Sequence, residues 1–286
     1  MTAPAVLLVL AVALASPAAA QGGATLVPQT GARSNEVRAS LEKIKLPPGF
    51  AISLYALVPS ARHMAVGPRG RITFIGTNRT RVYAMMDRGG KGVADEVRQF
   101  AANVDMKLPN GVCFARDGSL FIVEQNRVTA YPSAEEFSGR DIASVPVVRL
   151  GELIPPSEES SGHSTRVCRV GPDERLYISL GQPYNVSPRA KVAAYERLGI
   201  GGIISMTRDG KDRKVFAKGI RNSVGMDFNP ADGTLWFTDN QVDRMGDLIP
   251  PGELNRATRA GQNFGFPWYG GGRTDRKSTR LNSSHT

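Results

Sequence analysis

The sequence has few of the residues that build covalent or metal-based frameworks. It contains only two cysteines, Cys113 and Cys168, in 286 residues, which is too few for a disulfide framework or a four-thiolate zinc site. We interpret both as small buried residues. Aromatic residues make up only 7%, whereas 31 glycines and 19 prolines indicate many turns rather than long helices. An all-β fold is therefore expected.

Several functional motifs are also missing. There is no Walker loop and no H-E-x-x-H motif, and the glycine cluster at 199–202 lacks the spacing of a dinucleotide-binding loop. The net charge of +10 could attract a polyanion, but the basic residues are scattered along the chain and form no stripe. We therefore expect no nucleic-acid partner.

Both ends of the chain differ from its middle. The apolar run at 5–15 is too short to span a bilayer and is followed by Ala18-Ala19-Ala20, a pattern typical of a secretory signal peptide over residues 1–20. No membrane span is then expected after cleavage; the alternative is an uncleaved anchor. The last residues, 275–286, resemble translated sequencing-adapter DNA, so the natural chain is expected to break off near Thr274. A genuine basic tail is the alternative.

A repeated pattern runs through the middle of the chain. Four times, a short apolar strand is followed by a turn rich in Gly, Pro and Asp and by a second apolar strand, which predicts four hairpins. The anchor positions Val66, Phe114, Val170 and Phe228 are separated by 48, 56 and 58 residues. A period near 50 is typical of propeller blades.

The repeat predicts a six-bladed β-propeller that is incomplete here, with about four to five blades present. After a linker at 21–40, residues 41–274 would form this partial propeller, and they are too few for six blades of the observed length. A complete four-bladed propeller is the alternative. Helix is expected only at 35–44 and 190–197.

Aligning the blades locates a candidate site. Lys107, His163 and Arg221 each lie seven residues before an anchor, where the first blade has Pro59. Equivalent positions in a propeller share one radius and height, so these side chains should converge at the mouth of the central channel. Three potential cations around one axis would attract an anion.

Several motifs resemble those of the soluble pyrroloquinoline quinone (PQQ)-dependent glucose/sorbosone (aldose sugar) dehydrogenases, which are six-bladed propellers of the bacterial periplasm. The resemblance covers roughly 41–272, and the opening segment 44–50 suits the sorbosone-type branch. The motifs are Arg221–Pro230, which looks like Arg-Asn-x-x-Gly-x-x-Phe-x-Pro, His163 with Gly171-Pro172-Asp173, and Glu253-Leu254-Asn255 with Asn263–Pro267.

The resemblance implies a periplasmic or secreted oxidoreductase that oxidises an aldose or sorbosone-like sugar by hydride transfer to PQQ. His163 would be the catalytic base, Arg221 would stabilise the oxyanion on the quinone, and Asn222 and Lys107 would help bind the cofactor. A small sugar and a periplasmic electron acceptor, a quinone or cytochrome, would be its partners.

The resemblance also implies a Ca²⁺ ion held by the backbone carbonyls of Gln241 and Val242. The acidic side chains of Asp239, Asp243 and Asp247 are alternative oxygen ligands.

The sequence departs from the family in three respects. Gly162 stands where an acidic residue commonly orients the histidine, and Lys107-Leu108-Pro109-Asn110 lacks the glutamine of glucose-oxidising members. The basic residues of the family's last blades would lie beyond the break, so this fragment is expected to bind the cofactor poorly and to be inactive.

Asn185-Val186-Ser187 matches a glycosylation sequon that a bacterial periplasmic protein would not normally use.

Two other classes of function stay open. A calcium-dependent propeller hydrolase of the lactonase kind would need Asp, Glu and Asn converging on the axis, whereas the aligned positions carry Lys107, His163 and Arg221. A non-catalytic binding scaffold would need none of these residues.

Overall fold

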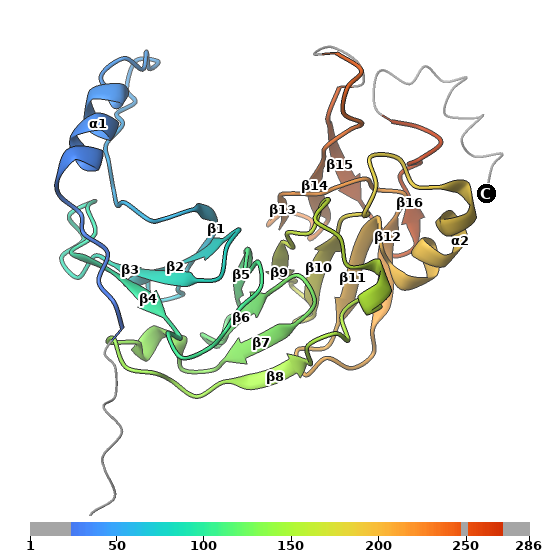
Figure 1. Ribbon diagram of the computed structural model, residues 1–286, viewed down its shortest axis with the longest axis horizontal. Coiled ribbons are helices and arrows are strands. Elements are labelled where there is room, and N and C mark those ends of the chain that lie inside the picture. Colours follow the sequence, from blue (N-terminus) through green and yellow to red (C-terminus); the bar gives the residue numbers. More distant parts are fainter. Residues whose placement is uncertain (1–23, 247–250, 271–286) are drawn as a thin grey trace, which may run out of the picture.

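The computed structural model describes residues 24–246 and 251–270. Its strands form four sheets that follow one another along an open arc, with the inner strands β1, β5, β9 and β13 on the concave side (Figure 1). The all-β propeller architecture is confirmed, and four blades are present in the described part of the chain. The predicted signal peptide and the adapter-like tail lie outside the described residues.

Each of the first two blades is a four-stranded antiparallel meander. The first contains β1 (Ala61–Val66), β2 (Ile72–Thr77), β3 (Val82–Met86) and β4 (Glu96–Phe100), and the second contains β5 (Gly111–Phe114), β6 (Leu120–Val123), β7 (Val128–Tyr131) and β8 (Val145–Val148).

The last two blades are less regular. The third has a fifth strand, β16, that runs parallel to β12, and the fourth has three strands among the described residues. The third contains β9 (Cys168–Val170), β10 (Leu176–Leu180), β11 (Gly202–Met206), β12 (Lys214–Lys218) and β16 (Gln262–Asn263), and the fourth contains β13 (Met226–Phe228), β14 (Leu235–Asp239) and β15 (Glu253–Ala257).

The four predicted hairpins are all present. Each anchor residue ends the inner strand of its blade and pairs with a residue at the start of the second strand. The pairs are Val66 with Thr73, Phe114 with Leu120, Val170 with Leu176 and Phe228 with Leu235. Because neighbouring blades cover both faces, the middle strands β6 and β10 are buried at every residue.

Helices are few, as expected. Helix α1 (Ala32–Leu41) begins three residues before the predicted segment, and α2 (Arg189–Leu198) matches the prediction and ends at Gly199 with a left-handed φ of 78°. Two short 3₁₀ turns are η1 (Ala134–Glu136) and η2 (Pro156–Glu158). Part of the predicted linker hydrogen-bonds to β4, where the Val27 N–H donates to Val97 O at 2.8 Å.

The core lies between the blades. Phe74 of the first blade contacts Phe114 of the second edge-on, and Tyr177 of the third contacts Phe228 of the fourth in the same way. Such pairs add about 0.5–1.5 kcal/mol each to the burial of their area. The blades are thus joined chiefly by apolar side chains from their facing sheets.

One interface between blades is also covalent. Cys113 of β5 and Cys168 of β9 form a disulfide with a Cα–Cα distance of 5.8 Å. Both residues are buried, as expected, but the interpretation of them as merely small buried side chains was wrong. The inner strands of neighbouring blades lie side by side, so residues 55 positions apart in sequence come into contact.

Candidate functional site

The aligned residues Lys107, His163 and Arg221 all lie in the loops that lead into the inner strands β5, β9 and β13. Backbone hydrogen bonds tie these loops to the turns beside them: Gln125 N–H donates to Lys107 O at 3.1 Å, and Gln182 N–H donates to Arg221 O at 3.2 Å. The blade alignment therefore places the three residues at the same end of the molecule.

The backbone and ring of His163 are held in a defined orientation. Its φ of 44° lies in the left-handed region, which histidine adopts more readily than most residues. Its Nδ1 lies 2.7 Å from the backbone oxygen of Gln182. Since a carbonyl only accepts hydrogen bonds, Nδ1 carries the hydrogen and Nε2 is left as the acceptor. The Gln182 carbonyl thus supplies the orientation for which Gly162 offers no side chain.

The surroundings of His163 favour the neutral imidazole. Burial lowers its pKa most, the Gln182 hydrogen bond works in the opposite direction, and the charges of Arg221 and Arg166 lower it further. The side chain of Asp243 raises it. A neutral ring with an unprotonated Nε2 can accept a proton near neutral pH.

Asn222 lies next to His163. Both approach the backbone of Gly181 so closely that a Cβ there would lie 2.6 Å from Asn222 Oδ1 and 2.7 Å from His163 Cβ. Asn222 Oδ1 is buried and has no hydrogen-bond partner among the described residues. An unsatisfied buried acceptor costs about 1–3 kcal/mol, so a ligand that donates a hydrogen bond here would remove that cost.

Arg221 is buried and joins two loops. Its guanidinium donates to Asn185 O at 2.9 Å, Asn240 O at 3.0 Å, Asn185 Oδ1 at 2.7 Å and Asp243 Oδ2 at 2.7 Å. These four bonds leave one N–H, on Nη1, without an acceptor in the described chain. The residue is therefore mainly a clamp between the loops after β10 and β14, with one donor left for a ligand.

Lys107 is exposed and paired with an acid. Its Nζ lies 2.7 Å from Glu159 Oε2, and this hydrogen bond lowers the pKa of the Glu159 carboxyl. With Arg221 paired to Asp243 and His163 neutral, the mouth does not present the three free cations that the sequence suggested.

The predicted calcium ligands follow β14. Gln241 is buried and Val242 half-buried, and Gln241 Oε1 has no partner among the described residues. Asp239 accepts the backbone N–H groups of Arg221 and Asn222, and Asp247 lies outside the described residues. Within 24–246 and 251–270, no three His, Cys, Asp or Glu side chains cluster as metal ligands. The oxygens available here are thus backbone carbonyls, the Gln241 amide and the carboxylates of Asp239 and Asp243, of which Asp243 is exposed and pairs with Arg221 through one oxygen.

The sequence did not reveal three residues that build this site. Gln182 acts through its backbone, Asn185 was noted only as a sequon, and Arg166 was not singled out. Their positions gave only weak signals: Arg166 lies three residues after His163, and Gln182 and Asn185 directly follow an apolar strand. The contact between Gln182 and His163 joins two loops of the third blade, whereas Arg166 and Asn185 also contact loops of the neighbouring blades.

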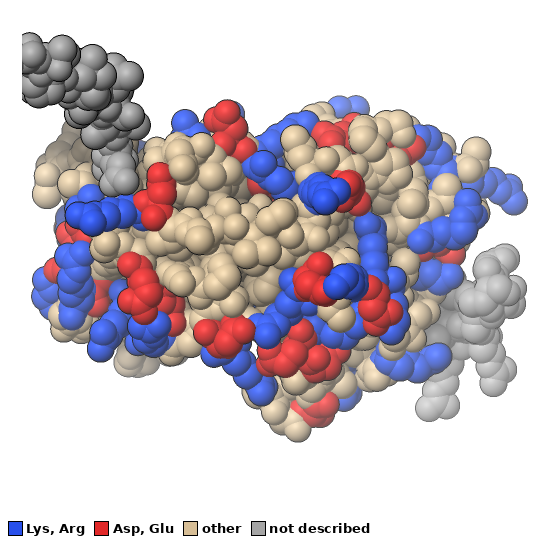
Figure 2. All heavy atoms as spheres, turned by 90° about the horizontal axis from the view of Figure 1, so that it is seen from below, with Lys and Arg blue, Asp and Glu red and all other residues tan. Residues whose placement is uncertain are grey.

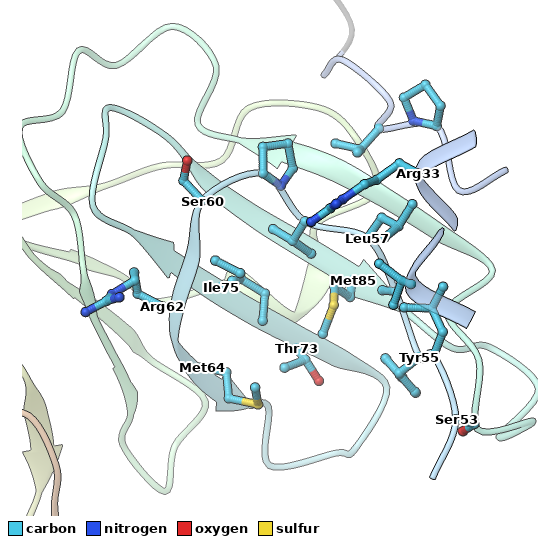
Figure 3. A pocket seen from close by; sticks show the side chains of 18 of the residues that line it. Arg33, Ser53, Tyr55, Leu57, Ser60, Arg62, Met64, Thr73, Ile75 and Met85 are labelled. Carbon is cyan, nitrogen blue, oxygen red and sulfur yellow. The ribbon is translucent and has the colours of Figure 1, made fainter. Parts of the chain in front are cut away.

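A cavity of about 1190 Å³ lies elsewhere, on the first blade (Figure 3). It is bounded by α1, the segment 52–62 and one face of β1, β2 and β3. None of its lining residues is Lys107, His163 or Arg221, so it is separate from the candidate site.

Charge is mixed on the surface. On the face shown in Figure 2, Lys and Arg side chains alternate with Asp and Glu and form no continuous basic stripe.

None of the described helices has the length and apolar character needed to cross a membrane.

Comparison with known proteins gives a family match. Residues 44–267 match a family model described as TrAA12-like. An uncharacterized protein of Borreliella burgdorferi is 27% identical over 232 residues, which are 79% of this chain and 56% of that protein. This chain therefore spans a little over half the length of that relative.

Solved structures share the fold at low identity. The calcium structure of a Trichoderma reesei protein of carbohydrate-active enzyme family AA12 is similar with a TM-score of 0.59 and 21% identity, over 75% of this chain and 57% of that one. A Thermus thermophilus protein described as a putative oxidoreductase (glucose dehydrogenase) gives 0.53 and 19%, over 77% and 67%.

Proposed function

Because the chain belongs to the TrAA12-like family, we propose that this protein is a periplasmic PQQ-dependent dehydrogenase of an aldose or sorbosone-like sugar. AA12 proteins are PQQ-dependent oxidoreductases. The observation that carries the proposal is the geometry of His163, a neutral imidazole whose Nδ1 is fixed by Gln182 and whose Nε2 is left as an acceptor. A general base for alcohol oxidation needs this arrangement.

The residues around His163 fit the cofactor. The unpartnered Asn222 Oδ1 and the remaining Arg221 N–H can hydrogen-bond to a polar ring system, and Lys107 Nζ can turn from Glu159 toward a carboxylate. PQQ, when bound, accepts the hydride that leaves the sugar carbon. A Ca²⁺ ion would be held by the carbonyls of Gln241 and Val242, and the unpartnered Gln241 Oε1 adds a third oxygen of the type that Ca²⁺ prefers.

The chain's own residues then have distinct roles. His163 Nε2 accepts the proton from the hydroxyl oxygen of the sugar, while the hydride leaves the carbon that bears this hydroxyl. The Gln182 carbonyl, bonded to Nδ1–H, stabilises the positive charge that develops on the ring. Arg221 holds the loops after β10 and β14 in place, and its one remaining N–H would be the donor it could offer to the cofactor.

The experiment is to purify the protein, add PQQ and Ca²⁺, and follow dye reduction with a panel of aldoses and sorbosone. We expect turnover of at least one sugar and a PQQ-dependent rise in melting temperature. Replacing His163→Gln should lower kcat by about 10²- to 10⁴-fold and retain the rise in melting temperature. The matched control is His63→Gln, a change on β1 outside the proposed machinery, which should retain turnover.

Two outcomes would contradict the proposal. One is the absence of both dye reduction and PQQ-dependent stabilisation. The other is hydrolysis of a lactone with Ca²⁺ alone, which would identify a propeller hydrolase. We also propose a periplasmic quinone or cytochrome as the electron acceptor, to be tested by replacing the dye with each of them.

A further inference from the structure

A second buried arginine lies beside the base. Arg166 is only 2% exposed, and it makes no ion pair with any carboxylate in the described chain. Its Nε donates to Gln125 O at 3.1 Å, and its Nη1 to His163 O at 3.1 Å and more weakly to Gly181 O at 3.5 Å. A buried guanidinium that relies on carbonyls alone is costly to desolvate.

The carbonyl partners of Arg166 are the parts of the backbone that orient His163. One is the carbonyl of His163 itself. The backbone of His163 has a φ of 44°, a strained conformation that persists only when the surrounding structure holds it. Another belongs to Gly181, the residue before Gln182, and Gln182 O accepts the hydrogen bond from the imidazole Nδ1. Nη1 donates to both of these carbonyls, while Nε, fixed in the same plane, donates to Gln125 O of the second blade; the single nitrogen of a lysine ammonium does not reproduce this planar arrangement.

From this arrangement we propose that Arg166 is a positioning residue for His163. It fixes the left-handed backbone of His163 and the end of β10, so that the imidazole keeps its Nδ1–H···O=C bond and directs Nε2 at the substrate. The inference rests on the proposed function, in which His163 is the base, but the orientation of the ring can be measured without any turnover.

Electrostatics supports the same role. The charged groups acting on the imidazole are Arg221, Asp243 and Arg166, and both arginines favour its neutral form. Burial lowers the pKa of Arg166 only to about 10, so its guanidinium stays charged near neutral pH.

The test uses NMR on the 286-residue chain, which has three histidines, His63, His163 and His285. Nitrogen shifts report the tautomer, a pH titration reports the midpoint of each ring, and His163→Gln and His63→Gln assign the signals. The variants are Arg166→Gln and Arg166→Lys. The matched control is Arg213→Gln, because Arg213 also donates to two carbonyls, Leu153 O and Leu198 O, but on the outer part of the third blade.

We expect the wild-type His163 ring to be the Nδ1–H tautomer with a midpoint below 6.5. Arg166→Gln should shift that midpoint upward and mix the tautomers, and it should lower kcat for sugar oxidation by about 10²-fold, as expected for a misplaced base, with a smaller change in KM. Arg166→Lys should keep the low midpoint because it keeps the charge, yet still mix the tautomers. Arg213→Gln should lower the melting temperature alone.

An unchanged tautomer and midpoint in both Arg166 variants would overturn the inference. If neither variant folds, the wild-type spectrum decides: an Nε2–H tautomer, or a midpoint at 6.5 or above, would overturn it as well. Altered ring signals without any sugar oxidation in the wild type would leave the role of Arg166 standing and refute the proposed function. Sugar oxidation by the wild type, with ring signals unaltered in the Arg166 variants, would support the proposed function and refute the positioning role of Arg166.

Discussion

At the scale of single residues, one carboxylate orders the backbone of the Arg221-Asn222 pair. Asp239, at the end of β14, accepts the N–H of Arg221 at 3.0 Å and that of Asn222 at 2.8 Å. Burial raises its pKa to about 6, against the lowering effect of these two hydrogen bonds. The folded state therefore favours the protonated, neutral form of Asp239 more than the unfolded state does.

This shift predicts a pH-dependent stability. The pKa of Asp239 is higher in the folded state than the ordinary value of 3.8, so the folded state binds more protons between the two values and loses stability as pH rises from about 4 to about 6. Relative to Asp239→Asn, the free energy of unfolding of the wild type should fall by about 2 kcal/mol over that range. Urea titrations of both proteins at pH 4, 5, 6 and 7 measure this difference.

The control is Asp232, for which the change of stability with pH has the opposite sign. The pKa of Asp232, an acid on the fourth blade, is lowered mainly by its hydrogen bonds to Thr234. Relative to Asp232→Asn, the wild type should therefore lose stability as pH falls. A difference between wild type and Asp239→Asn that does not change with pH would refute the assignment of a raised pKa to Asp239.

At the scale of elements, the disulfide joins two inner strands that no backbone hydrogen bond connects. Strands β5 and β9 belong to different sheets, and the bond between Cys113 and Cys168 closes a loop of 55 residues. By constraining a loop of that size in the unfolded chain, the disulfide raises the free energy of unfolding by at most about 4 kcal/mol. The second and third blades should thus separate more readily when the bond is reduced.

The corresponding prediction concerns heat stability under reduction. Adding a reductant should lower the melting temperature of the wild type but not that of the double variant Cys113→Ala with Cys168→Ala, which should melt near the reduced wild type. Thermal unfolding followed by circular dichroism, with thiols counted under denaturing conditions, measures both. Equal melting temperatures of the wild type with and without reductant would contradict the stabilising role.

The elements were predictable because their signals are local. Alternation and turn residues specify each hairpin, so Phe114 and Phe228 were assigned correctly as the ends of inner strands. The disulfide was missed although the blade alignment held a clue: Cys113 lies one residue before its anchor and Cys168 two before the next. The role of Asn185 could not be read, because its partners Arg221 and Asp243 lie 36 and 58 residues away, and that of Arg166 could not be read because it also depends on carbonyls of Gln125 and Gly181, which lie 41 and 15 residues away.

At the scale of the whole molecule, the described blades leave one face of the first sheet without a neighbouring blade. Phe74 and Ala84 pack toward the second blade, whereas Met64, Val66 and Ile75 face the cavity on the other side. The segment around Tyr55 to Val58 covers part of that face (Figure 3). In a closed propeller, a neighbouring blade covers each face.

This face should behave as an exposed apolar patch. Met64 and Val66 are 58% and 59% exposed and lie on the same side of β1, and contiguous apolar surface of this kind binds hydrophobic dyes and promotes self-association. The double change Met64→Lys with Val66→Lys should reduce dye fluorescence and self-association of the 286-residue chain. Its free energy of unfolding should change by less than about 0.5 kcal/mol for each exposed position.

The matched control is Leu150→Lys, at a position 66% exposed but outside the cavity. Because Leu150 does not line the cavity on the open face, its replacement should leave dye binding and sedimentation unchanged. Dye fluorescence and sedimentation velocity of the three proteins at matched concentration decide the matter. If Leu150→Lys reduced both signals as much as the double change did, the apolar surface responsible would not be the open face of the first blade.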